Sequence, residues 1–144
     1  MSKLTILLVA VVAALAVASA TSAMQPPVGV QAHPSKYGTV IFDRRGFALY
    51  AFTADSATAS ACSGDCAAAW PPLLTEGKPH ALRGIAAGKL GRIQRPDGTT
   101  QVTYAGHPLY FYLGDRRPAQ ILCQNVSEFG GLWLVVRANG RLVK

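Results

Sequence analysis

The stretch GFALYAFTAD at residues 46–55 recurs as GHPLYFYLGD at residues 106–115, without a gap and sixty residues later. Both copies begin with Gly, share Leu and Tyr, end in Asp and carry an aromatic residue two positions after the Tyr. This order predicts a turn, an aromatic-rich strand and a second turn in each copy. A repeat of this kind indicates a duplication, so we expect two equivalent β units in one small domain.

The repeated strands place aromatic residues two positions apart, so that each pair projects from one face of its strand. The pairs are Tyr50 with Phe52 and Tyr110 with Tyr112, and a Trp follows each copy, as Trp70 and Trp133. Aromatic side chains contribute much of the buried area of protein cores. We therefore expect the two repeats to pack around a shared core that contains Tyr50, Tyr110 and both Trp residues. An aromatic platform that binds sugar rings or peptides is the alternative.

The last residue of each copy is a carboxylate, Asp55 or Asp115, at the point where the strand ends. Asp commonly accepts hydrogen bonds from backbone N–H groups of the turn that follows, and this is the role we expect. If the symmetry of the repeats brought the two carboxylates together, they could instead bind a metal or act as a catalytic pair. Glycoside hydrolysis, for example, needs two carboxylates about 5–9.5 Å apart.

The rest of the chain is rich in turn signals. Hairpins are expected where Asp43-Arg44-Arg45-Gly46, Pro96-Asp97-Gly98 and Asn139-Gly140 separate strand-like stretches. The one expected helix runs from Cys66 to Trp70 and ends before two prolines, which cannot continue a helix. The sequence therefore predicts a mainly β (β-rich α+β) fold: duplicated β-hairpin units forming one small domain, with one short helix near the Cys-x-x-x-Cys segment.

The N-terminal segment, residues 1–23, has the order of a secretory signal peptide. Lys3 is followed by thirteen apolar residues from Ile6 to Ala18, and then by small residues that permit cleavage after Ala20 or after Ala23. A membrane span needs about 20 apolar residues, so we expect cleavage and no membrane span after it; a retained anchor is the alternative. The segment has no Cys for lipid attachment. We expect a periplasmic or secreted protein.

Cleavage after Ala23 leaves 121 residues, enough for one domain with a modest core. We expect an extended entry segment at 24–37 and a single domain at 38–144, with repeats at about 38–75 and 91–140. The mature chain has 13 Lys and Arg against seven Asp and Glu, a net charge of about +6.

This charge favours anionic partners. The doublets Arg44-Arg45 and Arg116-Arg117 are the densest positive points. The alternative interpretation is that they are ordinary charged turn residues on the protein surface. The basic residues are otherwise scattered, and an exported protein does not meet nucleic acid, so we expect no nucleic-acid partner.

The three cysteines of an exported chain enter an oxidising compartment. Cys62 and Cys66 are four residues apart and can reach the Cα separation of roughly 4.4–6.8 Å that a disulfide needs. We expect a local disulfide between them. Cys123 is then left over, either as a buried thiol, which we favour, or as a site of intermolecular pairing.

No motif with a known catalytic or ligand-binding mechanism appears in the sequence. His33, His80 and His107 lie far apart, and Cys-x-x-x-Cys has neither zinc-finger, thioredoxin nor haem-attachment spacing. There is no Gly-x-Ser-x-Gly, no phosphate loop and no dinucleotide fingerprint. We therefore expect a non-catalytic protein with no metal and no cofactor.

Several stretches together resemble a bacterial family of secreted repeats, usually described as predicted lipoproteins of unknown function, with a Tyr-x-[aromatic]-x-x-Asp motif. Tyr50, Phe52 and Asp55 match this motif, as do Tyr110, Tyr112 and Asp115. The other matching stretches are 62–67, 70–73, 95–98, 101–106 and 130–133, and the similarity spans about residues 38 to 140. The resemblance implies an envelope location and a β-rich fold, but no reaction. The chain lacks the lipid-attachment Cys of many members, and Cys123 stands where the family pattern has Gly.

Two functional hypotheses follow. The first is an exported, non-catalytic binding or structural module of the cell envelope, whose basic surface and aromatic strands meet an anionic envelope component or a glycan. The second is a periplasmic thiol-redox protein that uses Cys62 and Cys66 as an exchangeable dithiol. A reduction potential separates them, because structural disulfides have potentials below about −300 mV.

Overall fold

The computed structural model describes residues 27–144, so the expected signal peptide at 1–23 lies outside the described residues. Within this part the chain forms nine strands, one α-helix and one short 3-10 helix, which confirms the mainly β prediction. The strands are β1 (Gly29–Ser35), β2 (Gly38–Asp43), β3 (Tyr50–Phe52), β4 (His80–Ala81), β5 (Leu90–Gln94), β6 (Thr100–Tyr104), β7 (His107–Pro108), β8 (Val126–Glu128) and β9 (Gly131–Val135), and the helices are α1 (Asp65–Ala69) and η1 (Ala87–Lys89).

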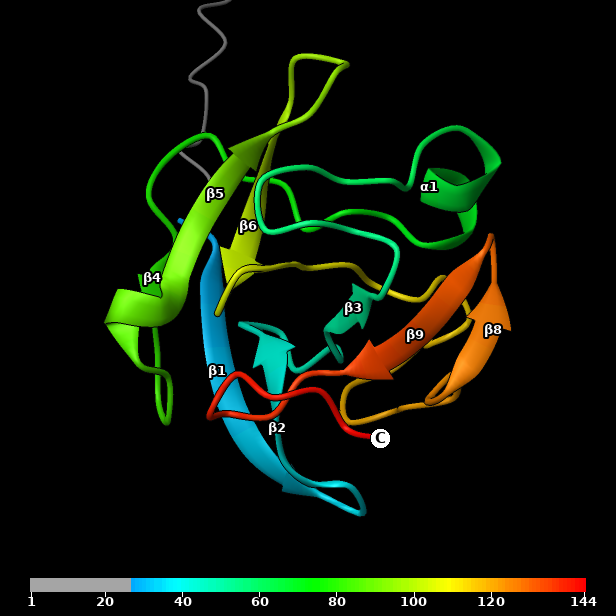
Figure 1. Cartoon of the computed structure of the whole chain (residues 1–144). Coiled ribbons are helices and arrows are strands. Elements are labelled where there is room, and N and C mark those ends of the chain that lie inside the picture. The colour runs from blue at the N-terminus through cyan, green and yellow to red at the C-terminus, as the bar shows by residue number, and fades with distance from the viewer. Residues whose placement is uncertain (1–26) are drawn as a thin grey trace, which may run out of the picture.

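The described strands make three small sheets of three strands each, in the orders β2-β1-β4, β3-β9-β8 and β5-β6-β7. Figure 1 shows β3 near the middle of the molecule, with the β1–β2 hairpin and the β5–β6 hairpin on one side and the β8–β9 hairpin on the other. All neighbouring pairs are antiparallel except β1 with β4. The first copy of the repeated motif, which includes β3, therefore lies where the three sheets meet.

Strand β1 lies within the segment expected to be an extended entry at 24–37. It pairs with β2 over six positions, from Val30 opposite Asp43 to Ser35 opposite Gly38. Val30 is fully buried, so the folded domain already includes this strand. The prolines around it mask the alternation of buried and exposed residues from which a strand is usually recognised.

The hairpin expected around residues 43–46 forms, but only the first part of its second strand, residues 47–49, pairs with β2; the rest pairs with β9. Asp43 accepts hydrogen bonds from the backbone N–H groups of Arg45 and Phe47, and Gly46 has the positive φ of +89° that such a turn needs. Leu49 still donates to the carbonyl of Ile41 on β2. The next three residues, β3, pair instead with β9.

The second copy of the repeat pairs in the same way as the first. In the first copy, Thr53 N–H donates to Leu132 O at 3.0 Å; in the second, Leu113 N–H donates to Ala69 O at 3.1 Å and Phe111 N–H to Pro71 O at 2.8 Å. The partner segment of the second copy contains two prolines, which have no N–H group to donate. For this reason residues 110–113 make a partial ladder where β3 and β9 make a complete one.

The core consists of two clusters of buried side chains that lie on either side of the repeated strands. One contains the aromatic residues Tyr50, Tyr110, Trp70 and Trp133, together with both cysteines of the Cys-x-x-x-Cys segment. The other is largely aliphatic and includes Leu49, Leu109 and Val102. The two repeats thus share one core that contains Tyr50 and Tyr110. In residues 27–144, no helix is long and apolar enough to cross a membrane.

The expected disulfide between Cys62 and Cys66 is present, with a Cα–Cα distance of 5.3 Å. It joins the loop before α1 to the first turn of that helix, which ends at the buried Trp70. Because the closed loop is short, the chain-entropy contribution of the bridge is at the low end for disulfides.

We expect Cys62→Ser to lower the free energy of unfolding by about 2 kcal/mol, measured by urea denaturation. Adding reductant should lower the stability of the wild type to that of the variant and leave the variant unchanged. A variant as stable as the oxidised wild type would contradict the structural role of the bridge.

Candidate functional site

The two copies of the repeat meet at their tyrosines. Tyr50 N–H donates to Tyr110 O at 2.9 Å, and Tyr110 N–H donates to Tyr50 O at the same distance. This exchange of two hydrogen bonds is the close antiparallel pairing of two residues. It relates the copies by an approximate twofold rotation, with the pair at its centre.

The side chains of the two tyrosines also connect the copies, because each phenol binds the Asp of the other copy. Tyr50 O–H donates to Asp115 Oδ2 at 2.7 Å, and Tyr110 O–H donates to Asp55 Oδ2, also at 2.7 Å. Each tyrosine therefore binds the carboxylate that ends the other copy. The motif residues form one reciprocal network, and Tyr50 and Tyr110 are completely buried in it.

The second oxygen of each carboxylate binds the turn that follows its own strand. Ala61 N–H donates to Asp55 Oδ1 at 2.7 Å, and Leu122 N–H donates to Asp115 Oδ1 at 3.0 Å. Both carboxylates accept backbone hydrogen bonds, the role expected from the sequence, and each also accepts a phenol. In residues 27–144, no group of three His, Cys, Asp or Glu side chains is placed to hold a metal ion.

The aromatic side chains form a column through the core. Trp70 and Trp133 stack with ring centroids 4.0 Å apart and planes within 4° of parallel. Phe52 continues the stack beyond Trp133 at 4.3 Å, and Tyr112 continues it beyond Trp70 at 4.7 Å. The column is thus formed by the Trp of each repeat and the second aromatic residue of the other repeat.

The tyrosines at the centre pack edge-on against this column, Tyr50 against Trp70 at 5.2 Å and Tyr110 against Trp133 at 5.1 Å. Edge-to-face and offset-stacked pairs are the favourable geometries for aromatic rings. Of the six aromatic residues, all but Tyr112 are buried. The five buried rings are covered and do not form an exposed platform for sugar rings or peptides, which was the alternative; Tyr112 is half-buried at the end of the column.

The environment of the network keeps the phenols protonated. Burial, reinforced by the hydrogen bond to Asp55, raises the pKa of Tyr110 to about 12, although the bond to Ser60 acts in the opposite direction. Burial and the Asp115 carboxylate raise the pKa of Tyr50 further. Burial also raises the pKa of both Asp55 and Asp115 above the ordinary value for Asp. Tyr50 and Tyr110 therefore remain hydrogen-bond donors throughout the physiological range of pH.

Arg95 is a component of the network that sequence reasoning missed. Its buried guanidinium donates to Ser60 Oγ at 2.9 Å, to Gln101 Oε1 at 2.7 Å and to the carbonyl of Cys62 at 2.6 Å. Ser60 Oγ in turn lies 2.7 Å from the phenol oxygen of Tyr110. The sequence interpretation placed Arg95 at the end of the strand before the hairpin turn at 96–98. The signal that could have revealed more was an arginine beside that turn within a stretch that matches the family.

The approximate symmetry is broken at the tryptophans and the cysteines. Trp70 Nε1 donates to Glu128 Oε2 at 3.0 Å, whereas the buried Trp133 Nε1 has no hydrogen-bond partner among the described residues. Cys62 directly follows Ala61, whose N–H binds Asp55. In the same way, Cys123 directly follows Leu122, whose N–H binds Asp115. Cys123 thus takes the position of Cys62 in the second repeat, without a second cysteine to bond.

The fold and this network define a duplicated β domain whose two halves are held together by shared motif residues. A family model described as a secreted repeat of unknown function, Lipoprotein_15, matches the chain twice, at residues 33–74 and 91–137. The chain belongs to this family of secreted repeats. Neither a curated protein nor a solved structure matches it.

We expect Tyr50→Phe and Tyr110→Phe each to lower the free energy of unfolding by about 1–3 kcal/mol, because each removes the phenol donor of a carboxylate, the buried Asp115 or the half-buried Asp55. Tyr37→Phe is the matched control: its ring is half-buried and its O–H bonds no described residue, so its effect should stay within about 0.5 kcal/mol. Chemical denaturation measures all three. A network role is contradicted if the three variants are equally stable.

Cys123 is free and half-buried, not fully buried as expected from the sequence, and its thiol should still react slowly in the native protein. Burial raises its pKa, although a hydrogen bond from Tyr112 opposes the shift, so at pH 8 it holds less of the reactive thiolate than free cysteine does. We expect its alkylation to be slower than that of free cysteine and to accelerate with rising pH. After denaturation without reductant, one thiol per chain should react with Ellman's reagent. Three would show that the disulfide had not formed, and none would show that Cys123 pairs between chains.

Proposed function

We propose that this protein is an exported, non-catalytic binding module of the cell envelope, periplasmic or secreted, whose partner is anionic. The observation that carries the proposal is the reciprocal Tyr–Asp network. The residues that define the repeat bind one another inside the fold, and each motif carboxylate has both oxygens occupied. The motif therefore builds a rigid support, and recognition is left to the loops and the basic surface.

The redox alternative receives less support from the geometry. Exchange requires a thiolate to reach a sulfur of the disulfide. Cys62 is 1% exposed and Cys66 is 6% exposed, and both pack in the aromatic core cluster. This burial favours a structural bridge, for which a reduction potential below about −300 mV is expected.

The proposal predicts that the mature protein binds isolated envelope material through charge. Residues 24–144 carrying a C-terminal tag would be incubated with membrane, peptidoglycan and soluble polysaccharide fractions, and the bound protein would be measured by sedimentation. We expect retention on at least one fraction at 20 mM salt and release at 1 M salt, where electrostatic interactions are screened beyond about 3 Å.

The control is an unrelated basic protein of similar size and net charge, which measures non-specific adsorption. Retention above this control supports a binding module. Retention equal to the control on every fraction would overturn the proposal.

A further inference from the structure

Two loops that are distant in the sequence lie side by side in the fold. The turn at 43–46 touches the loop at 116–119: Ala119 N–H donates to Gly46 O at 2.9 Å. Gly46 has a φ of +89°, and a Cβ at this position would lie 3.1 Å from Cβ of Pro118. A side chain at position 46 would therefore both strain the turn and push the second loop away.

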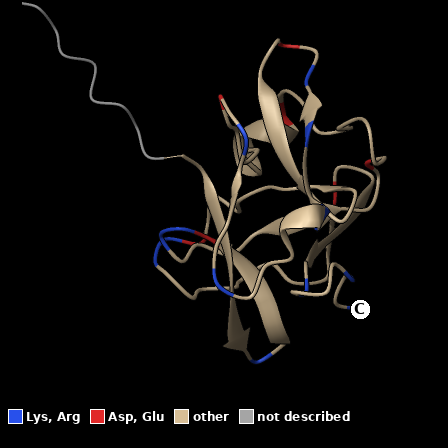
Figure 2. Cartoon of the chain, turned by 90° about the vertical axis from the view of Figure 1, so that its left-hand side faces the viewer, with Lys and Arg blue, Asp and Glu red and all other residues tan. Residues whose placement is uncertain are grey.

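This contact brings together the two arginine doublets of the sequence, Arg44-Arg45 and Arg116-Arg117. All four side chains belong to exposed residues. Figure 2 shows Lys and Arg spread over the chain, with blue segments gathered in loops at the left of the view. We call these four residues the arginine cluster.

The positive charge of the arginine cluster is largely uncompensated. The neighbouring carboxylates of Asp43 and Asp115 are buried and accept hydrogen bonds from within the fold. In residues 27–144, Arg45 is the one member of the cluster with a carboxylate partner, Asp43 at 2.9 Å. Arg44 donates to the carbonyl of Pro27 at 3.4 Å, so the guanidinium groups of Arg116 and Arg117 are the two without a partner in residues 27–144, and their donors are free to bind an oxyanion.

The duplicated fold supplies an internal comparison for this cluster. The equivalent junction at the other end of the repeats joins Gly106 to Ala57, where a Cβ on the glycine would lie 3.5 Å from Cβ of Ala57. The residues sixty positions from the two doublets are Tyr104 and Ala105, and Ser56 and Ala57, none of which is charged. Since one junction carries four arginines and its twin none, the fold itself does not require the charge.

A hollow with two adjoining parts lies beside Arg44 and Arg45 of the arginine cluster. Its first part has a volume of about 460 Å³ and is lined by Arg44, by Arg45 with its partner Asp43, and by the apolar side chains of Leu73, Leu74 and Phe111. Arg116 and Arg117 belong to the neighbouring loop and are not among its lining residues.

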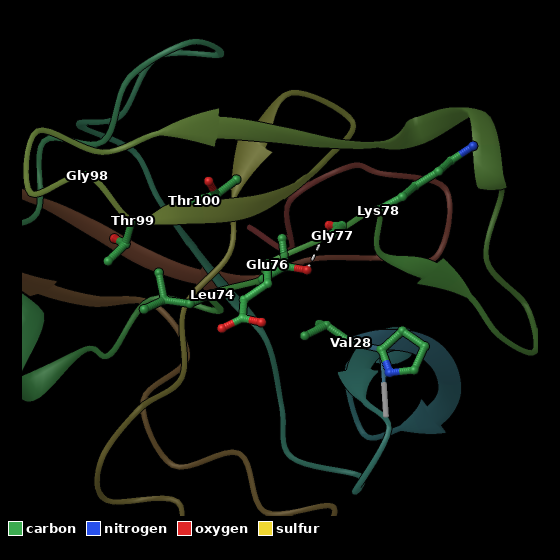
Figure 3. Close-up of a pocket in the computed structure, with 10 residues that line it drawn as sticks. Val28, Leu74, Glu76, Gly77, Lys78, Gly98, Thr99 and Thr100 are labelled. Atoms are coloured by element: carbon green, nitrogen blue, oxygen red, sulfur yellow. Dashed lines mark hydrogen bonds between the residues drawn. The ribbon is translucent and has the colours of Figure 1, made fainter. Parts of the chain in front are cut away.

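The second part of the hollow has a volume of about 770 Å³, shares Leu74 and Val28 with the first, and is lined by Glu76, Thr99 and Thr100. Figure 3 shows the Glu76 carboxylate between Leu74 and Val28. The first part thus carries two arginines and apolar side chains, and the second carries hydroxyl groups together with the carboxylate of Glu76 and the ammonium group of Lys78.

We propose that the arginine cluster and this hollow bind an acidic polysaccharide. The guanidinium groups bind the carboxylate of an acidic sugar, and the apolar floor at Leu74 and Phe111 contacts a sugar ring face. The polar groups of the second part accept and donate hydrogen bonds to the hydroxyls of the following neutral sugar. Two adjoining hollows that share Val28 and Leu74 offer places for successive sugars of a chain, which a flat bilayer surface would not fill. This inference rests on the proposed function and names its ligand class and site.

The test uses oligosaccharides of hyaluronan, in which acidic and neutral sugars alternate, and chitin oligosaccharides as the uncharged comparison. Binding to the mature wild-type protein would be measured by calorimetry at 20 mM salt. We expect the hyaluronan chain to bind and the chitin chain to bind much more weakly.

The site is tested by R116Q/R117Q, with R92Q/R141Q as the matched control. Arg92 and Arg141 are exposed and lie outside the arginine cluster, so both variants lose two positive charges. We expect R116Q/R117Q to weaken binding about tenfold or more, and the control about twofold or less. The thermal unfolding midpoint of each variant shows that it is folded.

The hollow is tested separately by Leu74→Glu, with Leu132→Glu as its control. Leu74 is 41% exposed and lines both parts of the hollow, and Leu132 is 39% exposed on β9. We expect Leu74→Glu to weaken binding of a hexasaccharide and Leu132→Glu to leave it unchanged.

Three results would overturn the inference. Equal losses in both arginine variants would mean that binding follows net charge, which leaves the proposed function standing without this site. Binding to phosphatidylglycerol vesicles but not to hyaluronan would replace the polysaccharide by a membrane surface. No binding to either, together with retention on envelope fractions equal to the control, would remove the proposed function as well.

Discussion

The paired hydrogen bonds between Tyr50 and Tyr110 are the constraint on which the rest of the structure depends. They fix the two copies in one antiparallel register, and that register brings each phenol to the carboxylate of the other copy. Without the other copy, the buried Asp115 and the half-buried Asp55 would each lose a phenol donor, so neither half can satisfy its own motif alone. The two repeats therefore share one core, in which each supplies hydrogen bonds that the other lacks.

The aromatic column follows from the same crossing. Because each Trp stacks on the second aromatic residue of the other repeat, the core cannot be divided between the halves. The departures from symmetry lie at its edges. The loop after the first copy has a disulfide and accepts hydrogen bonds from Arg95, whereas the loop after the second copy has the unpaired Cys123, and Glu128 binds Trp70. The residues at the centre of each repeat are therefore held by contacts with the other repeat, and the two repeats differ in the residues farther from this centre.

Local patterns were enough to predict the duplication, the short helix and the disulfide, because each depends on neighbouring residues or on a fixed offset. The partners of the motif side chains could not be predicted. A strand places Tyr50 on one face but does not say whether Asp55 or Asp115 will meet it. Arg95 was missed for the same reason, since its acceptors at Ser60 and Cys62 lie more than thirty residues away. Strand β1 was missed because prolines interrupt its pattern.

The antiparallel pairing of Tyr50 with Tyr110 also determines which loops of the two copies lie side by side. In an antiparallel pair, the residues before Tyr50 lie beside those after Tyr110, and the reverse holds at the other end. The fold thus creates two equivalent junctions, one between Gly46 and Pro118 and one between Gly106 and Ala57. A contact that serves only stability would be served equally well by uncharged residues at both junctions. Four arginines lie at one junction alone, so the symmetric support does not account for their charge, whereas the proposed binding surface would.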